Sequence, residues 1–259
     1  MKKTNLIVMA LSALVAFGFS SCAKKTQVVI NGVQDLSGKT LGCQAGTTGE
    51  LFIQEEVEGA TLKSFKTGID ASLALKNGAV DAVVLDELPA KEIVKRNPQL
   101  KIVDAEFATE EYAIAVRKGE AELLSAINGT IKNMKNNGVY ENLVNTFMPV
   151  EGEIELPQDI TSGSTDVIRM GTNAAFPPFE YTLGSKVVGF DITLSQMIAR
   201  DYNKKLEVVD MSFDGLIAAL QSGAIDFIAS GMTATDERRK NVDFSEPYYT
   251  SKQVVIVRK

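Results

Sequence analysis

Two stretches of the chain carry side chains that together could hold a small zwitterion. Ser230-Gly231-Met232-Thr233 leads into the charged run at 234–240 (ATDERRK). Hydroxyl groups, free backbone N–H groups and the start of a short helix are typical of an anion pocket, and Arg238 can add a bidentate contact to a carboxylate. Gly46-Thr47-Thr48-Gly49, which opens a predicted helix, offers a second set of donors. Asp86 supplies the opposite charge, so these residues suit a ligand with a carboxylate and an ammonium group.

Each of these residues has a plainer interpretation when it is taken alone. Arg238 stands in a charge run that favours a solvated surface, and Asp86, directly before a predicted helix, is typical of an N-cap. Phe176 in the FPPF stretch and Phe213 ahead of a helix are residue types found more often in a core than in a ligand site. The individual residues therefore leave both interpretations open.

The composition excludes several classes of function. The chain has 259 residues, no His and a formal net charge of -6. Without His, the Ser-His-Asp, Cys-His and His-rich metal mechanisms are ruled out. The negative charge is the wrong sign for a nucleic-acid binder, whose affinity rests on clustered Lys and Arg. We therefore expect no nucleic-acid partner, no cofactor and no metal.

The elements that must position these residues alternate between strand-like and helix-like runs, which favours an α/β fold with mainly parallel sheets. Strands are predicted at 39–43, 61–65, 80–85, 101–103, 112–116, 167–171, 206–209, 225–229 and 253–257. Helices are predicted at 50–57, 70–77, 88–95, 121–134, 139–147, 191–201, 213–222 and 237–239. Residues 149–165 have no apolar period and contain Pro, Gly, Ser and Thr, which indicates a linker.

One unit of the sequence occurs twice. Residues 74–81 (ALKNGAVD) resemble residues 219–226 (ALQSGAID), and in each copy a helix is predicted to end at a Gly before a strand. Beyond that strand stands Asp86 in the first copy and Gly231 in the second. Ligands of open α/β sheets bind outside the carboxyl ends of strands, so these two places are expected to line a cleft between two lobes.

The first residues resemble an export signal. Two Lys precede the mostly apolar run 6–19, and fourteen residues at about 1.5 Å each are too short to cross a bilayer core of about 30 Å. Ser20-Ser21-Cys22 resembles a bacterial lipobox, in which Cys22 carries the lipid, although Phe19 stands where Leu is usual. Simple cleavage without lipid is the alternative. Cys43 is then left alone as a buried thiol, so we expect no disulfide within the chain.

Longer matches decide between the open interpretations. The sequence resembles the polar amino-acid binding proteins of ABC importers, which have the type II periplasmic binding fold. The matching stretches are 36–39 (LSGK), 46–48 (GTT), 82–86 (AVVLD), 112–119 (YAIAVRKG), 171–180 (GTNAAFPPFE), 188–191 (VGFD), 213–217 (FDGLI), 231–238 (GMTATDER) and 243–249 (DFSEPYY). The resemblance extends over nearly the whole chain after Cys22. The resemblance implies an α/β fold of two lobes joined by a hinge.

The order of these stretches departs from the family. Family members start with the segment that here begins near Asp166 and end with the one that here finishes near Met148. The chain thus resembles a circular permutant, in which residues 149–165 join the family's old termini. We therefore predict a signal peptide at 1–21, a smaller lobe 2 at 26–110, a contiguous lobe 1 at 111–250 and a hinge strand at 251–259.

The resemblance also assigns roles to residues. It implies that Arg238 holds the ligand carboxylate, assisted by Thr233 and by the backbones of Gly231 and Thr48. It implies further that Asp86 holds the ammonium group, with Ser230 nearby, and that Phe176 and Phe213 enclose the ligand side chain. Asn173 stands where several relatives carry an Asp that contacts the ligand side chain. This difference favours a neutral polar amino acid over a cationic one.

The implied function is an extracytoplasmic receptor, held on a bacterial membrane by a lipid on Cys22, at the periplasmic face where there are two membranes. It would bind a free polar L-amino acid as a monomer and deliver it to ABC permease subunits. Two alternatives remain. One is a receptor that reports to a membrane sensor, and the other is a cyclohexadienyl-dehydratase-like enzyme on the same fold, with Glu180 or Glu87 as its acid. We expect no catalytic residue.

Overall fold

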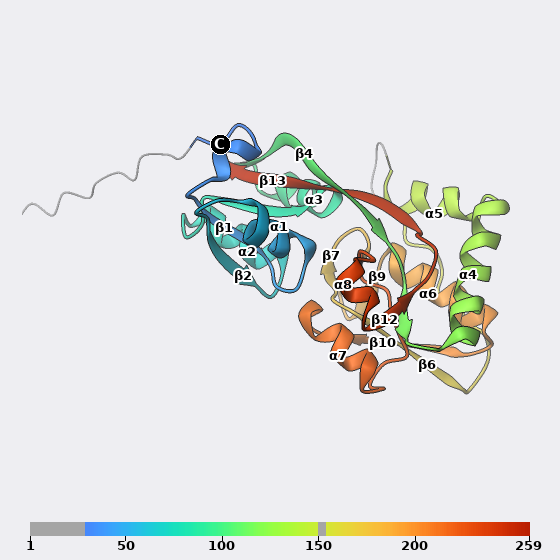
Figure 1. Cartoon of the computed structure of the whole chain (residues 1–259). Coiled ribbons are helices and arrows are strands. Elements are labelled where there is room, and N and C mark those ends of the chain that lie inside the picture. Colours follow the sequence, from blue (N-terminus) through green and yellow to red (C-terminus); the bar gives the residue numbers. More distant parts are fainter. Residues whose placement is uncertain (1–28, 150–153) are drawn as a thin grey trace, which may run out of the picture.

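The computed structural model describes residues 29–149 and 154–259, and it consists of two α/β lobes (Figure 1). The predicted signal peptide and Cys22 lie outside the described residues, as do residues 150–153 of the predicted linker. Residues 154–165 of that linker contain no helix or strand. In the part of the chain that is described, no helix has the length and apolar character needed to cross a membrane.

Lobe 2 is built around a five-stranded sheet of order β2-β1-β3-β13-β4. Its elements are η1 (Val33–Leu36), β1 (Thr40–Gln44), α1 (Thr48–Glu56), β2 (Thr61–Phe65), α2 (Gly68–Lys76), β3 (Ala82–Asp86), α3 (Glu87–Arg96), β4 (Leu100–Tyr112) and β13 (Tyr249–Arg258). Strands β1, β2 and β3 are parallel, and β13 is antiparallel to both β3 and β4. Every residue of β3 is buried, because helices cover both faces of the sheet at this strand.

Lobe 1 contains a second five-stranded sheet, of order β10-β6-β11-β5-β12, and a small antiparallel sheet β7-β8-β9. Its elements are β5 (Ala115–Arg117), α4 (Ala121–Asn136), α5 (Val139–Phe147), β6 (Val167–Thr172), β7 (Ala175–Phe176), β8 (Glu180–Leu183), β9 (Lys186–Val188), α6 (Phe190–Asp201), β10 (Lys205–Asp210), η2 (Phe213–Gly215), α7 (Leu216–Gln221), β11 (Phe227–Ile228), α8 (Asp236–Arg239) and β12 (Val242–Phe244).

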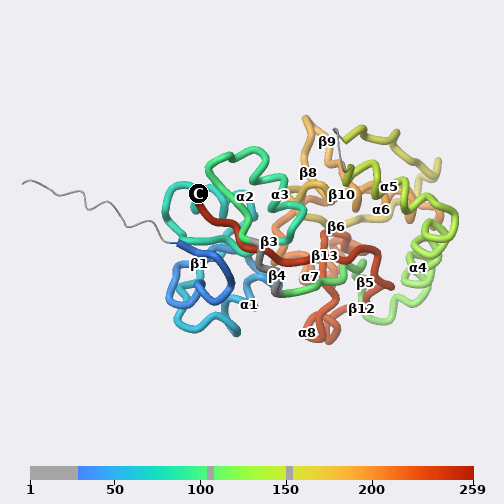
Figure 2. Tube along the Cα trace, turned by 90° about the horizontal axis from the view of Figure 1, so that it is seen from above, coloured from blue at the N-terminus to red at the C-terminus, as the bar shows by residue number. Residues whose placement is uncertain are grey.

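The chain crosses between the lobes twice. It passes from β4 to β5 through Ala113 and Ile114, and it returns from β12 to β13 through residues 245–248. Strands β4 and β13 are paired and run side by side from one lobe to the other (Figures 1 and 2). The second crossing, which the sequence alone could not settle, is therefore present. Tyr112 at the first crossing is fully buried, with its ring edge on Phe179 at 5.2 Å between centroids.

Three differences from the predicted elements have physical reasons. The predicted strand 112–116 is two strands, because the chain leaves one sheet at Tyr112 and enters the other at Ala115. Strand β4 extends far beyond the predicted 101–103. Its later residues are held by pairing with β13, and the sequence shows no apolar pattern there that would predict a strand. The sheet β7-β8-β9 was not predicted, since its strands are two to four residues long and show no apolar alternation.

Candidate ligand-binding site

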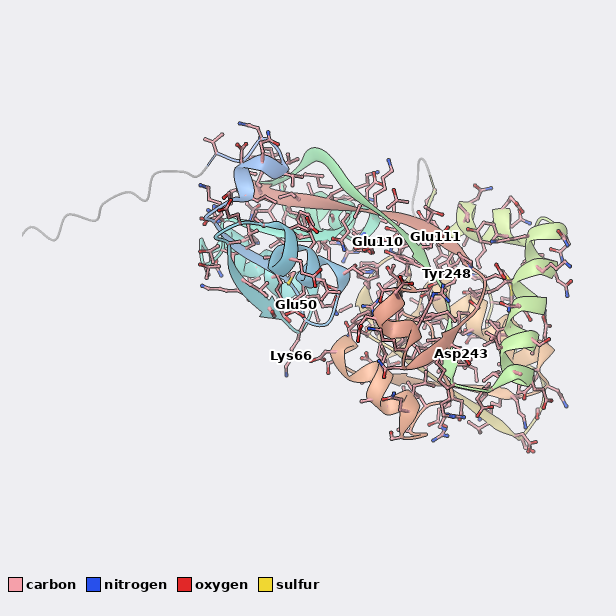
Figure 3. The ribbon with its side chains drawn as sticks, viewed as in Figure 1. Glu50, Lys66, Glu110, Glu111, Asp243 and Tyr248 are labelled. Carbon is pink, nitrogen blue, oxygen red and sulfur yellow. The ribbon has the colours of Figure 1, made fainter. Side chains whose placement is uncertain are left out.

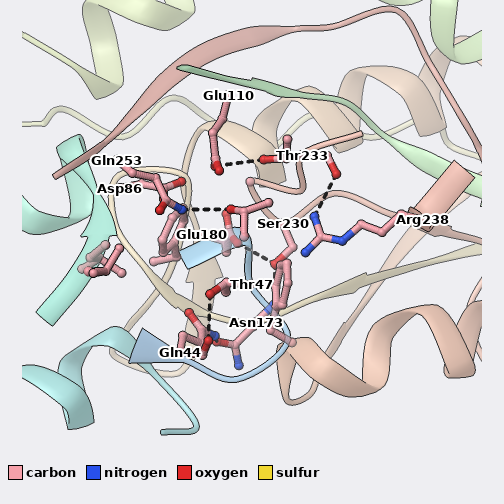
Figure 4. Close-up of a pocket in the computed structure, with 16 residues that line it drawn as sticks. Gln44, Thr47, Asp86, Glu110, Asn173, Glu180, Ser230, Thr233, Arg238 and Gln253 are labelled. Atoms are coloured by element: carbon pink, nitrogen blue, oxygen red, sulfur yellow. Dashed lines mark hydrogen bonds between the residues drawn. The ribbon is translucent and has the colours of Figure 1, made fainter. Parts of the chain in front are cut away.

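A cavity between the lobes brings together all nine residues that were predicted to bind the ligand (Figure 4). These residues are Thr48, Asp86, Asn173, Phe176, Phe213, Ser230, Gly231, Thr233 and Arg238. The cavity has seven further lining residues, Gln44, Thr47, Val84, Leu85, Glu110, Glu180 and Gln253. The structure thus places the predicted residues together, whereas the role of each remains a prediction.

Arg238 comes from the short helix α8 and is buried rather than solvated. The hydroxyl of Thr235 accepts a hydrogen bond from the Arg238 backbone N–H at 3.2 Å and so caps this helix. The guanidinium Nη1 donates to the Thr233 carbonyl and Nη2 donates to the Gly46 carbonyl of lobe 2, each at 2.8 Å. The Phe213 ring lies under the guanidinium, 5.3 Å from Cζ to the ring centroid. Burial lowers the pKa of Arg238, and Glu110 and Asp86 oppose that shift.

Asp86 ends β3 on the opposite side of the cavity, and its side chain makes no capping bond to α3 although it occupies the N-cap position. Its carboxylate accepts hydrogen bonds from the Tyr112 hydroxyl and, at 3.3 Å, from Gln253 Nε2. Burial raises the pKa of Asp86 well above its ordinary value, repulsion from Glu110 raises it further, and the two hydrogen bonds act against both. The geometry therefore favours a contact with something bound in the cavity over a helix cap.

Glu110 is a second buried carboxyl group in the cavity, and the sequence analysis missed it. It lies on β4 and accepts a hydrogen bond from the Thr233 hydroxyl at 2.9 Å (Figure 4). Burial raises the pKa of Glu110, while the hydroxyls of Thr48 and Thr233 and the charge of Arg238 lower it. Glu110 was missed because it lies in none of the matched motifs. Its place in the cavity depends on the pairing of β4 with β13.

Gly231 is a position where glycine is required by the backbone. Its φ is +51°, and a Cβ atom there would lie 2.7 Å from the Phe176 ring. The backbone N–H of Gly231 donates to Asp191 Oδ2 at 2.9 Å, and the same oxygen accepts from the Tyr248 hydroxyl at 2.7 Å. Asp191, on α6, thereby holds this part of the cavity wall in place.

Glu180 and Asp191 form a buried acid pair behind the wall. Glu180 Oε1 accepts from the Ser230 hydroxyl at 2.7 Å, and that hydroxyl oxygen accepts the Asn173 backbone N–H at 3.1 Å. Burial and the charge of Asp191 raise the pKa of Glu180 well above its ordinary value, and burial raises the pKa of Asp191 to about 6. Glu180 Oε2 and Asp191 Oδ1 have no hydrogen-bond partner among the described residues, so a proton shared between the two carboxyl groups would satisfy both atoms and leave the pair with one negative charge.

The far end of the cavity is closed by two amides from different lobes. Gln44 Nε2 donates to Asn173 Oδ1 at 2.9 Å, and Asn173 Nδ2 donates to the Met211 carbonyl at 2.8 Å. Neutral groups therefore form this end of the cavity, whereas the charged groups gather at the other (Figure 4). Gln44 was not predicted as a site residue, because a lone Gln at the end of a strand carries no motif.

Of the two glutamates predicted as the acid of an enzyme, only one lies in the cavity. Glu180 lines the cavity, but Glu87 pairs with Lys91 at 2.6 Å and is not among the lining residues. Within residues 29–149 and 154–259, no three His, Cys, Asp or Glu side chains gather in a way that could hold a metal ion.

Known proteins are similar to part of the chain. Residues 168–259 match the profile of bacterial extracellular solute-binding proteins, family 3. This segment is similar to that family. Seven of the nine predicted site residues lie in it, from Asn173 to Arg238, whereas Thr48 and Asp86 lie in the part that precedes it.

Several relatives that match part of the chain are named as binding proteins. The arginine-binding extracellular protein ArtP of Bacillus subtilis (strain 168) is 46% identical over 98 residues, which is 38% of this chain and 38% of ArtP. The L-cystine-binding protein TcyJ of Escherichia coli (strain K12) is 30% identical over 128 residues, 49% of this chain and 48% of TcyJ. A solved ancestral arginine-binding protein bound to arginine is 52% identical over 32% of this chain and 37% of that one, with a TM-score of 0.32. The chain thus matches less than half the length of these relatives.

Proposed function

We propose that this protein is an extracytoplasmic receptor that binds a free polar L-amino acid between its two lobes and delivers it to the permease of an ABC importer. One observation carries the proposal: Arg238 from lobe 1 and Asp86 from lobe 2 are buried on opposite sides of one cavity. An α-amino acid carries the two complementary charges on one carbon atom. The names of the relatives, which refer to binding of arginine or cystine, support a binding role over catalysis.

Binding requires the lobes to move. The cavity has a volume of about 20 Å³, which is room for about one water molecule and not for an amino acid. The bonds from Arg238 to Gly46 and from Gln44 to Asn173 both join the lobes across it. We therefore infer that the lobes separate to admit the ligand and close on it, because only the closed form contacts the ligand from both sides. Small-angle scattering that detects no compaction with a bound ligand would refute this closure.

Thermal unfolding tests the proposed function directly. A protein that starts after Cys22 is heated with each of the twenty common L-amino acids at millimolar concentration. A ligand with a micromolar dissociation constant should stabilise the fold by about 4 kcal/mol and raise the midpoint by several degrees. Stabilisation by one or a few amino acids is expected. A protein that unfolds cooperatively and responds to none of the twenty would contradict amino-acid binding.

Asn173→Asp tests the assignment of the ligand side chain. A carboxylate at the neutral end of the cavity is expected to raise the affinity for L-arginine or L-lysine about tenfold, the effect of one added charge-assisted contact. The change also removes the donor to the Met211 carbonyl, so a lower unfolding midpoint without ligand is expected. Calorimetric titration measures the affinity. A variant that gains no affinity for either amino acid would argue against a contact between residue 173 and the ligand side chain.

The lipid anchor and the order of the segments belong to the same proposal. The anchor rests on Cys22 in its lipobox-like context. The permuted order rests on the sequence, in which the stretches that resemble the family's start, from near Asp166 onward, follow those that resemble its end. A chain rearranged to begin at Asp166, run to Lys259 and continue from Val29 to Met148 is expected to fold and to bind the same amino acid.

A further inference from the structure

Glu110 and Asp86 are two carboxyl groups that face the same end of the cavity. They are 5% and 7% exposed, and repulsion from Glu110 acts on Asp86. They come from different elements, since Asp86 ends β3 whereas Glu110 lies on the crossing strand β4 (Figure 4). One ammonium group needs only one carboxylate for charge balance, so the second carboxyl group requires an explanation.

The groups around this pair do not neutralise two negative charges. Arg238 is the one cation among the lining residues, and its Nη1 and Nη2 donate to the carbonyl oxygens of Thr233 and Gly46. The Tyr112 hydroxyl and Gln253 Nε2 face Asp86, and the hydroxyls of Thr48 and Thr233 face Glu110. These groups are neutral, and the raised pKa of Glu180 on the lobe 1 side adds no positive charge. The surroundings therefore support one full negative charge on the pair and a proton shared with it.

We propose that Asp86 and Glu110 together hold the α-ammonium group of the ligand, and that this pair releases a proton to solvent as the ammonium group binds. This inference rests on the proposed function. An ammonium group has three N–H donors, so it can donate to both carboxylates and to the Thr233 hydroxyl at once. The bound ammonium group then replaces the proton in compensating the negative charge of the second carboxylate. Glu110 is thus a further ligand-binding residue.

The pair also makes affinity depend on pH in a defined direction. The free protein carries a proton that the complex lacks, so the affinity is expected to rise with pH through the raised pKa of the pair and to level off above it. Burial is the largest cause of both raised pKa values. A single carboxylate with an ordinary pKa would give a flat response above about pH 5.

Glu110→Gln tests the inference, with Glu111→Gln as the matched control. Gln keeps the size of the side chain and can still accept from Thr233. Glu111 is the next residue on β4, but its side chain is exposed and lies outside the cavity (Figure 3). Wild type and both variants are titrated calorimetrically with L-arginine and L-glutamine, which share the same α-ammonium group. Two buffers with different ionisation enthalpies give the number of protons released.

For wild type and Glu111→Gln we expect release of up to about one proton at pH values below the raised pKa of the pair, and for Glu110→Gln a smaller release, because the repulsion from Glu110 no longer raises the pKa of Asp86. We also expect Glu110→Gln to bind about tenfold or more weakly, from the loss of one charge-assisted contact. Equal affinities and equal proton release in both variants would overturn the inference while the proposed function stands. A wild-type protein that binds neither probe and is stabilised by none of the twenty amino acids would count against the proposed function, and this inference would fall with it.

Discussion

Replacing Arg238 with Ala is expected to weaken amino-acid binding at least about a hundredfold, or roughly 3 kcal/mol or more, and to remove the thermal shift in the ligand screen. The guanidinium is buried at the junction of the lobes and is the one cation in the cavity lining. Without it, the ligand carboxylate would enter a space that already contains Asp86 and Glu110. Calorimetric titration with the stabilising amino acid measures the loss.

Two companion variants separate a binding effect from a folding effect. Arg239→Ala removes the neighbouring cation, which is exposed and lies over the Phe244 ring outside the cavity, so its binding should match wild type. Arg238→Lys keeps the charge but not the two-pronged geometry that reaches both Thr233 and Gly46, so an intermediate loss is expected. Cooperative unfolding of Arg238→Ala together with binding within a few-fold of wild type would exclude Arg238 as the carboxylate ligand.

The largest loss of stability is expected from Asp191→Ala. This carboxylate is fully buried and accepts from both the Gly231 backbone and the Tyr248 hydroxyl. Ala would leave two buried donors without an acceptor, which costs about 3–5 kcal/mol in the free energy of unfolding. For a protein of this size that corresponds to a midpoint lower by about 10 °C. Differential scanning calorimetry measures the shift.

The control for this prediction is an exposed acid with a partner. Asp166 pairs with Lys204 at 3.1 Å and is largely solvated, so Asp166→Ala should change stability by about 0.5 kcal/mol or less. Asp191→Asn retains one acceptor oxygen and should fall between Ala and wild type, which keeps the test informative even if the Ala variant does not fold. A midpoint for Asp191→Ala close to that of Asp166→Ala would show that the wall at Gly231 does not depend on Asp191.

The repeated helix-to-strand unit shows why much of the fold could be predicted. In both copies the helix ends at a glycine with positive φ, Gly78 at 73° and Gly223 at 78°. One residue after each glycine, the N–H groups of Ala79 and Ala224 donate to the carbonyls of Ala74 and Ala219. These helix ends are determined by residues close together in the chain, so they can be predicted from a single sequence. The strands β3 and β11 follow as expected.

The parts that escaped prediction depend on partners far away in the chain. Glu110 became a site residue because β4 pairs with β13, more than a hundred residues later. Gln44 contacts Asn173 across 129 positions. Eight of the nine predicted residues belong to matched motifs and Ser230 directly precedes one, whereas Glu110 and Gln44 belong to none. Motifs can therefore suggest which residues bind the charged groups of a ligand. The second carboxyl group, Glu110, and the amide end of the cavity could be identified only from the structure.

The path of β13 has a consequence for the order in which the protein can form. This strand lies between β3 and β4 in lobe 2, yet the ribosome adds it only after the whole of lobe 1. Until then β3 lacks one neighbour and β4 lacks the strand that holds it in the sheet, so lobe 2 cannot complete its core. The lobe that is synthesised first is thus the lobe that finishes folding last, because the ten residues of β13 are needed to complete its sheet.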